Sequence, residues 1–468
     1  MRNLVSRSVV FAVASLVFAS AVSAQQATAV SERDVIKRVD EYMKAAVEHE
    51  RFSGSILIAK DGKPIVSKGY GMANVEFDAP NTPQTVFRLA SVTKQFTAAA
   101  IMMLQERGKL SVNDPVCKHL AECPTAWQPI TVRHLMTMTS GLPNLSGRDL
   151  GPLSGLPVPW EQWFTAIKAK PLVEVPGETF RYNNNGYTVL GLIIERLSGK
   201  TYGEFLKENI FAPLGMSRSG YEDPARIIKN RATGYRYLPG EPIANVPYAE
   251  MIRLYAAGGV YSTSEDLLKW DQALYTEKLL TRMSIDEMAT PFREMFHGKG
   301  YGYGLWSSQQ NGRTEIAHGG NLAGFITYLA RFPNEKVTII VLSNNGRGSS
   351  LKISRVLSSI VFGANYEIPK ARRTVDIPLA TLEKYVGEYD AKFPPTKYSI
   401  TIENGKLTFN EAGFLKAELF AESDTDFYLK AADIQLKFIK DVSGTVTGFT
   451  VFQGDSTLYE VVDVMRVK

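Results

Sequence analysis

Strand-like segments stand at both ends of the first 365 residues, and helical segments stand between them. Residues 55–59 and 64–67 are largely apolar and are joined through Asp61-Gly62, a dipeptide that favours a tight hairpin turn. Further strand-like segments, separated by turns that contain glycine or asparagine, follow at 301–307, 315–318, 325–332 and 337–342. The pattern predicts an α+β fold in which one antiparallel sheet is built from both ends, with helices on its faces and an inserted helical region.

The helices between the strands are marked by apolar residues at helical spacing. A helix from Ser91 to about Gly108 would place Phe96, Ala100, Met103 and Leu104 on its apolar face. Residues 262–265 read as a capping box for a helix that ends near 274. Residues 144–160 are irregular and rich in glycine, proline, leucine and serine, and such a segment more often borders a site than links domains. Further helices are expected at 31–50, 130–143, 187–199, 203–211 and 349–361.

The character of the chain changes near residue 376. Short alternating segments recur there at the spacing of a small barrel or sandwich, after a linker at about 365–374. This C-terminal region, 376–468, contains no histidine and no cysteine, and we find no catalytic group of residues in it. Its strands are expected at 398–402, 406–410, 416–420, 427–430, 435–439, 446–452 and 458–463.

The first 24 residues have the form of an export signal. Arg2 and Arg7 precede an apolar run over 9–22, and Val22-Ser23-Ala24 is a small-residue cleavage site. The run is too short for a stable membrane span, and no cysteine stands at the cleavage point to carry a lipid. We therefore expect a periplasmic or secreted protein without a stable membrane anchor. Loss of the two arginines takes the net charge from +5 to +3, which gives no argument for nucleic-acid binding.

Cysteine use points to a disulfide and away from a metal. The two cysteines, Cys117 and Cys123, are six positions apart, and in an oxidising compartment a small disulfide loop is the leading interpretation. The chain has neither an HExxH nor a CxxC pattern, and its five histidines are scattered. We therefore expect no catalytic metal.

A serine and a lysine lie three positions apart at the start of the helix that follows residue 90. This spacing is nearly one helical turn, so Ser91 and Lys94 can reach each other. A serine hydroxyl becomes a good nucleophile when a base takes its proton, and a lysine can act as that base once burial and a helix N-terminus favour its neutral form. A second copy of the spacing, Ser349 and Lys352, follows a glycine-containing loop and reads instead as a cap of a surface helix.

Two further groups of residues could complete such a site. Tyr182-Asn183-Asn184 is the only Tyr-x-Asn triplet in the chain and stands where an extended segment enters a helix. A tyrosine near the lysine could keep it neutral or protonate a leaving group, although a turn with a core tyrosine is the simpler interpretation of this triplet alone. His318-Gly319-Gly320 lies between two expected strands. Its glycines would let a substrate backbone approach, and its histidine could donate to a carboxylate or an oxyanion, although alone it too reads as a plain turn.

Together, in this order and spacing, these blocks resemble the serine beta-lactamase and penicillin-binding-protein superfamily. The resemblance covers about residues 35–365 and includes the blocks at 137–143 and 257–261 beside the three motifs. Its closest branch is similar to class C beta-lactamases and their DD-peptidase, D-aminopeptidase and esterase relatives. The resemblance implies a five-stranded antiparallel sheet between helices beside an all-helical region, within a domain of about 31–365. The C-terminal region resembles the lipocalin-like accessory domain of some of these hydrolases.

The resemblance also implies roles for individual residues. Ser91 would be the acylated nucleophile, activated by Lys94 alone or with Tyr182, and which group is the base is disputed across these enzymes. Tyr182 would also protonate the leaving group and help to activate the deacylating water, and Asn184 would orient Lys94 and a substrate amide. His318 and Gly320 would stand at the third motif. The backbone N–H groups of Ser91 and Asn321 would form the oxyanion hole, and no cofactor is implied.

The sequence departs from the class C pattern in two places. His318 stands where class C beta-lactamases carry a lysine, so a fixed positive charge for a beta-lactam carboxylate is replaced by a residue that is mostly neutral at pH 7. Met138 stands where many relatives show a histidine, and the sequence gives no mechanism for that change.

Three functions follow as hypotheses. The first is an exported serine hydrolase that cleaves an amide or ester, favouring a D-amino-acid peptide or ester over a beta-lactam. The second is a penicillin-binding sensor that is acylated without turnover. The third, an interaction protein with an inactive site, conflicts with the joint presence of Ser91, Lys94, Tyr182 and Asn184.

Overall fold

The computed structural model describes most of the chain after residue 29. The signal at 1–24 and most of the irregular segment 144–160 lie outside the described residues. The described ranges are 30–145, 160–237, 242–246, 254–294, 299–346, 350–392, 395–411, 415–430, 434–453 and 461–467.

One antiparallel sheet joins the two ends of the first 365 residues, as predicted. Strands β1 (Gly54–Lys60) and β2 (Lys63–Tyr70) form the hairpin, and β1 also pairs with β15 (Val337–Ser343), for example Ile56 with Val341. The strand order is β10-β11-β12-β13-β14-β15-β1-β2. The described sheet thus has eight strands where we expected five, because β10 (Arg293–Glu294), β11 (Gly300–Tyr301) and β12 (Trp306–Gln310) extend the edge beyond β13 (Arg313–Leu322) and β14 (Phe325–Phe332).

Two prediction errors in this sheet have a local cause. The expected single strand at 301–307 is broken between β11 and β12, because Gly304 adopts φ +70° and the chain bends there. The expected strand at 315–318 is longer, so His318-Gly319-Gly320 lies within β13 and is not a turn. Gly320 pairs directly with Thr327 of β14.

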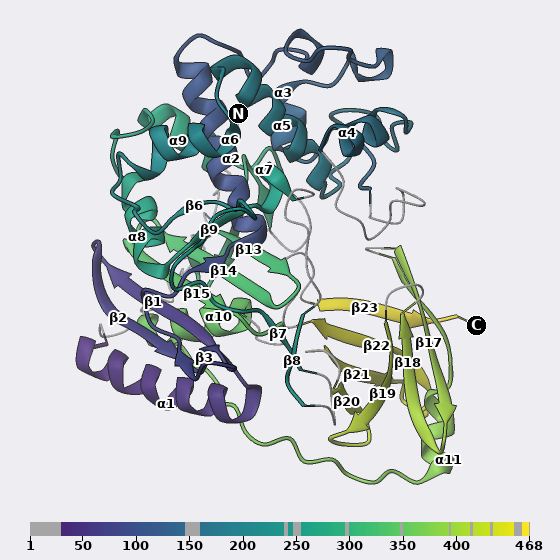
Figure 1. The fold of residues 1–468 in the computed structure, drawn as a ribbon. Helices are drawn as coiled ribbons and strands as arrows, with labels where there is room; N and C mark the ends of the chain where they lie inside the picture. Colours follow the sequence, from purple (N-terminus) through teal and green to yellow (C-terminus); the bar gives the residue numbers. More distant parts are fainter. Residues whose placement is uncertain are drawn as a thin grey trace, which may run out of the picture.

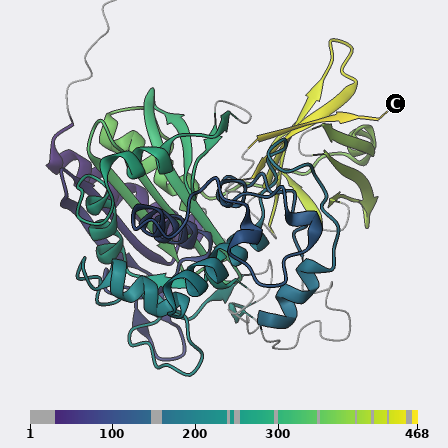
Figure 2. The same cartoon turned by 90° about the horizontal axis from the view of Figure 1, so that it is seen from above.

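Helices cover both faces of the sheet (Figures 1 and 2). On one face, α1 (Glu32–Glu50) and α10 (Ser350–Phe362) pack together against residues such as Ile56 and Val341. On the other face, α8 (Ser264–Ala273) packs on β1 and β15, and the turn that begins α2 (Thr93–Glu106) packs on β13 and β14. Helix α2 is buried on all sides from Thr93 to Leu104, so the expected single apolar face was too narrow.

The helical region confirms most expected helices and corrects some boundaries. Thr263 is the cap of α8, and its side chain accepts from the Asp266 N–H. Gly199 ends α5 in the left-handed region, with φ 69°. The described elements here are α3 (Val132–Met136), α4 (Trp160–Lys168), α5 (Asn184–Ser198), α6 (Tyr202–Leu206) followed by a π-helical turn (Lys207–Phe211), α7 (Tyr255–Gly258), α9 (Arg282–Ala289), and the short strands β3 (Met72–Asn74), β4 (Ala79–Pro80), β5 (Phe87–Arg88), β6 (Gly220–Tyr221), β7 (Tyr235–Arg236), β8 (Ala244–Asn245) and β9 (Val260–Ser262).

The C-terminal strands close into a barrel. The sequence had left a small barrel and a sandwich as alternatives, and the structure shows the barrel. β16 (Gly387–Lys392), which we did not predict, pairs with β23 (Val461–Arg466) and closes the ring. Aromatic side chains such as Tyr389, Phe438 and Phe449 fill the interior. The remaining strands and the short helix before them are β17 (Pro395–Glu403), β18 (Lys406–Glu411), β19 (Leu415–Ala421), β20 (Asp426–Leu429), β21 (Ile434–Lys440), β22 (Val446–Gln453) and α11 (Leu379–Leu382).

A segment without helix or strand, 363–378, connects α10 to the barrel along the lower edge of Figure 1. Its end is docked on the barrel, because the Val375 N–H donates to Ala421 O at 2.9 Å and Arg372 stacks on the Tyr428 ring. Among the described helices, none is both long and apolar enough to span a membrane.

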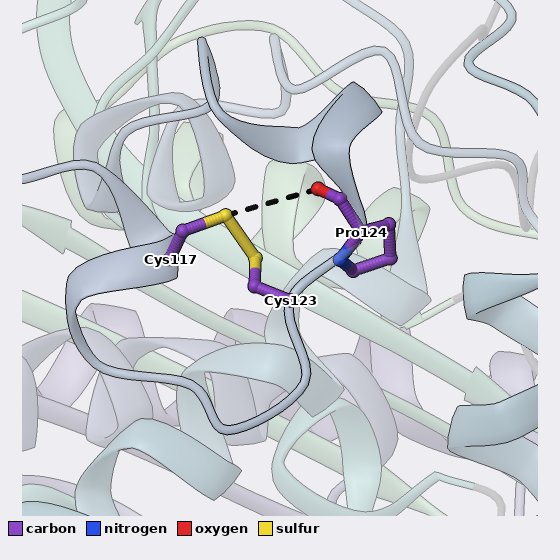
Figure 3. The surroundings of a disulfide bond; sticks show 3 residues. All are labelled: Cys117, Cys123 and Pro124. Carbon is purple, nitrogen blue, oxygen red and sulfur yellow. Dashed lines mark hydrogen bonds between the residues drawn. A yellow bond between two sulfur atoms is a disulfide. The ribbon is translucent and has the colours of Figure 1, made fainter.

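Cys117 and Cys123 form a disulfide, with their Cα atoms 5.2 Å apart (Figure 3). Both residues pack against the core of the helical region. We expect Cys117→Ala/Cys123→Ala to lower the free energy of unfolding by about 2 kcal/mol, because the bridge closes a short loop and removes modest entropy from the unfolded chain. Urea titration of the wild type and the double variant measures this difference. An equal loss on reduction of the wild type, and none on reduction of the variant, would assign the effect to the bridge.

Candidate active site

Ser91 stands in a sharp turn between β5 and α2. Ala90, the residue before it, has φ +48°, which is costly for a residue with a Cβ, and such backbone conformations persist only where the surroundings hold them. The Leu89 N–H donates to Val260 O at 2.9 Å, and Thr327 Oγ1 donates to Leu89 O at 2.8 Å. Strands β9 and β14 therefore hold the turn from two sides, and Ser91 is left partly exposed at the start of the helix.

A buried carboxylate holds the strand that leads into this turn. Both Arg88 and Arg231 donate to Glu222, with Arg88 Nε at 3.0 Å and Arg231 Nη1 at 2.9 Å. The Glu222 side chain is 2% exposed, and the Glu222 N–H donates to Gly259 O at 2.8 Å. Sequence analysis did not find this group, because its members are far apart in the chain and no spacing links them.

Lys94 lies at the centre of the site. Its Nζ is 2.9 Å from Ser91 Oγ, 2.9 Å from Asn184 Oδ1 and 2.8 Å from the backbone oxygen of Ala257. A neutral amine has two N–H bonds and one lone pair. Asn184 Oδ1 and Ala257 O can only accept, so they take both N–H bonds, and the lone pair is left facing the Ser91 hydroxyl.

Burial favours that neutral form. Lys94 is 0% exposed, and burial lowers its pKa well below the ordinary value of a lysine. The rings of Tyr182 and Tyr187, with centroids 4.9 and 5.6 Å from Nζ, favour the charged amine and so oppose the effect of burial on the Lys94 pKa. The loss of hydration is the larger effect, because these rings replace only a small part of the water shell of an ammonium ion.

Tyr182 is positioned by the block at 137–143. The Arg181 N–H donates to Met138 O at 2.8 Å, and the Asn183 side chain donates to Leu142 O at 2.6 Å while it caps α5. Met138 has a structural role that the sequence did not reveal. Its sulfur accepts a hydrogen bond from the Asn183 N–H, with 3.3 Å between nitrogen and sulfur. The extended segment that carries Tyr182 is thus held at both ends before α5 begins.

Burial is the main influence on the pKa of Tyr182 and raises it. The hydrogen bond of the Tyr182 hydroxyl with the Ser91 side chain lowers this pKa by a smaller amount. The net pKa is raised, so the phenol keeps its proton at neutral pH. Tyr182 is therefore better suited to donate a proton than to accept one from Ser91.

The third motif differs from its prediction. His318 is 0% exposed, its Nδ1 lies 2.6 Å from Gly319 O, and its Nε2 lies 3.2 Å from the Tyr301 hydroxyl. Burial, the main cause, lowers its pKa to about 3, and a proton on Lys94 would lower it in the same direction. Both ring nitrogens are engaged, so the predicted donation from His318 to a substrate carboxylate or oxyanion does not fit this arrangement.

Gly320 has a structural neighbour that the sequence did not predict. A Cβ at Gly320 would lie 2.2 Å from Leu89 O, so the missing side chain makes room for the Ser91 turn. The approach of a substrate to the backbone of Gly320 stays a prediction. Asn321, the next residue, is exposed at the end of β13. Its position leaves it accessible beside the turn that β13 supports.

The second serine–lysine spacing contributes nothing to this site. Lys352 forms an ion pair with Glu50, and Ser349 lies outside the described residues. Among the described residues, no group of three or more histidine, cysteine, aspartate or glutamate side chains could hold a metal ion.

The α+β fold has an antiparallel sheet between helices, a serine–lysine pair at the start of a buried helix, and the Tyr182 ring beside the lysine amine. Together these features define a protein of the beta-lactamase/transpeptidase-like class. The Beta-lactamase family profile matches residues 35–355, and the chain belongs to this family. Residues 371–464 match a second profile, described as Domain of unknown function (DUF3471). A lipocalin likeness of the barrel stays a prediction.

Comparison with individual proteins agrees with this assignment. The chain is 31% identical over 425 residues to a penicillin-binding protein of Bacillus subtilis (strain 168), covering 84% of this chain and 91% of that protein. The octameric penicillin-binding protein homologue from Pyrococcus abyssi is 28% identical with a TM-score of 0.66, covering 92% of this chain and 99% of that one. The D-amino acid amidase from Ochrobactrum anthropi SV3, at 22% identity, TM-score 0.62, and 71% and 99% coverage, shares the fold.

Proposed function

We propose that this protein is an exported serine hydrolase that cleaves an amide or ester bond through an acyl-enzyme at Ser91. The observation that carries the proposal is the Lys94 amine, whose two acceptor contacts leave the third direction to Ser91 Oγ at 2.9 Å. A buried neutral amine in hydrogen-bond reach of a serine is the pairing that nucleophilic catalysis requires.

The steps follow from where the protons can go. Lys94 takes the Ser91 proton as Oγ attacks the substrate carbonyl. Tyr182, which keeps its proton at neutral pH, donates to the leaving group and then, as a phenolate, accepts a proton from the water that attacks the acyl group. As the acyl group leaves, Lys94 returns its proton to Ser91 Oγ. Asn184 holds Lys94 by its oxygen, and the N–H groups of Ser91 and Asn321 stabilise the oxyanion.

The substrate class follows from the third motif. A neutral, buried His318 offers no fixed positive charge for the carboxylate of a beta-lactam. This favours an ester or an amide, including D-amino-acid peptides, over penicillins and cephalosporins. A class C-like beta-lactamase is the alternative within the same chemistry. A penicillin-binding sensor is the alternative of another kind, and similarity to the Bacillus subtilis penicillin-binding protein favours it.

The domain boundaries and location belong to the proposal as well. We infer that residues 1–24 direct export, that 31–365 form the hydrolase domain, and that 376–468 form an accessory barrel. A disulfide at Cys117 and Cys123 suits the oxidising compartment to which such a signal leads.

The test is the intact mass of wild type and Ser91→Ala after incubation with a penicillin and, separately, with an activated acyl ester, followed over time. We expect an adduct on the wild type alone, formed fastest with the ester and lost as product appears. A penicillin adduct that persists would support the sensor, and one that decays quickly would support a beta-lactamase. Equal masses for the two proteins with both reagents would remove Ser91 from the mechanism.

A further inference from the structure

We propose that Tyr301 is a positioning residue that fixes the tautomer and the orientation of His318 beside the Ser91–Lys94 pair. Tyr301 belongs to β11, outside the motifs that sequence analysis singled out as catalytic. The effect on rate rests on the proposed acyl-enzyme mechanism, whereas the effect on the histidine ring can be measured without it.

A count of protons around His318 assigns the donors. Nδ1 faces the backbone oxygen of Gly319 at 2.6 Å, and that oxygen can only accept, so Nδ1 carries the proton. In a neutral ring Nε2 then has only a lone pair. The Tyr301 hydroxyl, 3.2 Å from Nε2, must be its donor. This tautomer leaves His318 without a free N–H group, because Nδ1–H faces Gly319 O and the Nε2 lone pair faces the Tyr301 hydroxyl.

The ring stands next to the groups that carry out the proposed reaction. Its centroid is 6.4 Å from that of Tyr182, and Lys94 is close enough that a positive charge on it would lower the histidine pKa. Lys94 gains a positive charge when it takes the Ser91 proton. A protonated His318 would oppose that charge, so a donor that keeps Nε2 an acceptor helps Lys94 to act as a base. The titratable groups around His318 are Lys94 of α2, Tyr182 before α5, and Tyr301 of β11, with Tyr187 of α5 behind Tyr301.

The position of the Tyr301 ring does not depend on its hydroxyl. The side chain is 1% exposed, and its ring packs on Trp306 and Phe180 with centroid distances of 4.7 and 5.7 Å. Tyr301 also pairs with Trp306 across the β11–β12 ladder. Tyr301→Phe therefore removes the contacts of the hydroxyl with His318 and Tyr187 and keeps the ring packing, which separates a positioning role from a structural one.

Nitrogen NMR of protein labelled in its histidine rings tests the tautomer directly. His318→Gln identifies the His318 signals by their loss. We expect wild type at pH 7 to show a protonated Nδ1 and an unprotonated, hydrogen-bonded Nε2, and Tyr301→Phe to shift the Nε2 signal and introduce the other tautomer. A protonated Nε2 in the wild type would overturn the proposal, and so would unchanged His318 signals in Tyr301→Phe.

Kinetics supplies the second arm, with Tyr303→Phe as the matched control. Tyr303 is a buried tyrosine two residues away, and its hydroxyl donates to Glu287 at 2.8 Å. With the ester substrate, we expect Tyr301→Phe to lower kcat about tenfold with KM changed less than about twofold, and Tyr303→Phe to leave both within about twofold. Equal losses in the two variants would overturn the proposal by showing a general packing effect. If Ser91 forms no acyl-enzyme, the proposed function fails, and the NMR result alone still decides the role of Tyr301.

Discussion

Lys94→Met will lower kcat/KM for the preferred ester or amide by about a thousandfold while the fold is kept, since general-base catalysis contributes factors of about 10²–10⁴. Methionine matches the length and the apolar surroundings of the 0% exposed lysine, so it removes the base without leaving a large cavity. The measurement is steady-state kinetics together with the rate of adduct formation on Ser91 by mass spectrometry.

The chain supplies a matched control for this substitution. Lys352 is also three residues after a serine, but it is partly exposed and pairs with Glu50 on the far side of the sheet. We expect Lys352→Met to keep kcat/KM within about twofold, because surface ion pairs contribute little. A large loss in Lys352→Met, or retained activity in Lys94→Met, would contradict the assignment of Lys94 as the base.

The same substitution should change how stability depends on pH. Burial lowers the folded-state pKa of Lys94, so between that pKa and the unfolded-state value near 10.5 the unfolded chain binds more protons than the folded one. Stability contributed by this site therefore rises with pH across the window and is lost as pH falls. The free energy of unfolding of Lys94→Met minus that of the wild type should become more positive as pH is lowered from 10 towards 7. A constant difference would mean that Lys94 is charged in the folded protein.

Those parts of the fold that follow from local pattern could be predicted from the sequence. Asp61-Gly62 fixed the hairpin because a two-residue turn of this kind has few alternatives. The alternation in the C-terminal region gave most of the barrel strands. The break at Gly304 was not predictable, because the reason for it is tertiary: a Cβ there would lie 2.6 Å from Lys94 O, so the chain bends to accommodate α2. The extra edge strands and the burial of α2 on all sides likewise depend on neighbours distant in sequence.

The candidate site, like the fold, was predictable from the sequence only in part. The spacing of Ser91 and Lys94 and the resemblance at Tyr182 and Asn184 predicted side chains that the structure brings around one amine. The backbone oxygen of Ala257 has no sequence signature, because any residue would supply it. The direction in which His318 points depends on Tyr301, which reaches it only through the pairing of β11 with β12. Motifs thus identified the residues that meet in the candidate site, whereas their orientation required the fold.

Gly320→Ala is the second substitution with a large expected effect, and it tests the structural role of this glycine beside the Ser91 turn. An added Cβ would lie 2.2 Å from Leu89 O and 2.5 Å from Thr327 Oγ1, the two atoms whose hydrogen bond holds the Ser91 turn against β14. The backbone of Gly320 lies outside the left-handed region, so alanine is acceptable there for the main chain itself. The whole effect therefore comes from crowding of the turn.

We expect Gly320→Ala to lower kcat/KM about a hundredfold, because displacing a reactive group by about 1 Å costs on this order. Gly346→Ala is the control, since its nearest neighbour would be an ordinary 3.5 Å contact with Gly324 N. Thermal unfolding of both variants separates displacement of the turn from general destabilisation. If Gly320→Ala kept full activity, the Leu89–Ser91 turn would have room to move, and the view that β13 and β14 hold the nucleophile in place would be wrong. If activity fell while the adduct on Ser91 still formed at the wild-type rate, the crowding would act after acylation, on the water or on the acyl group, and not on the nucleophile.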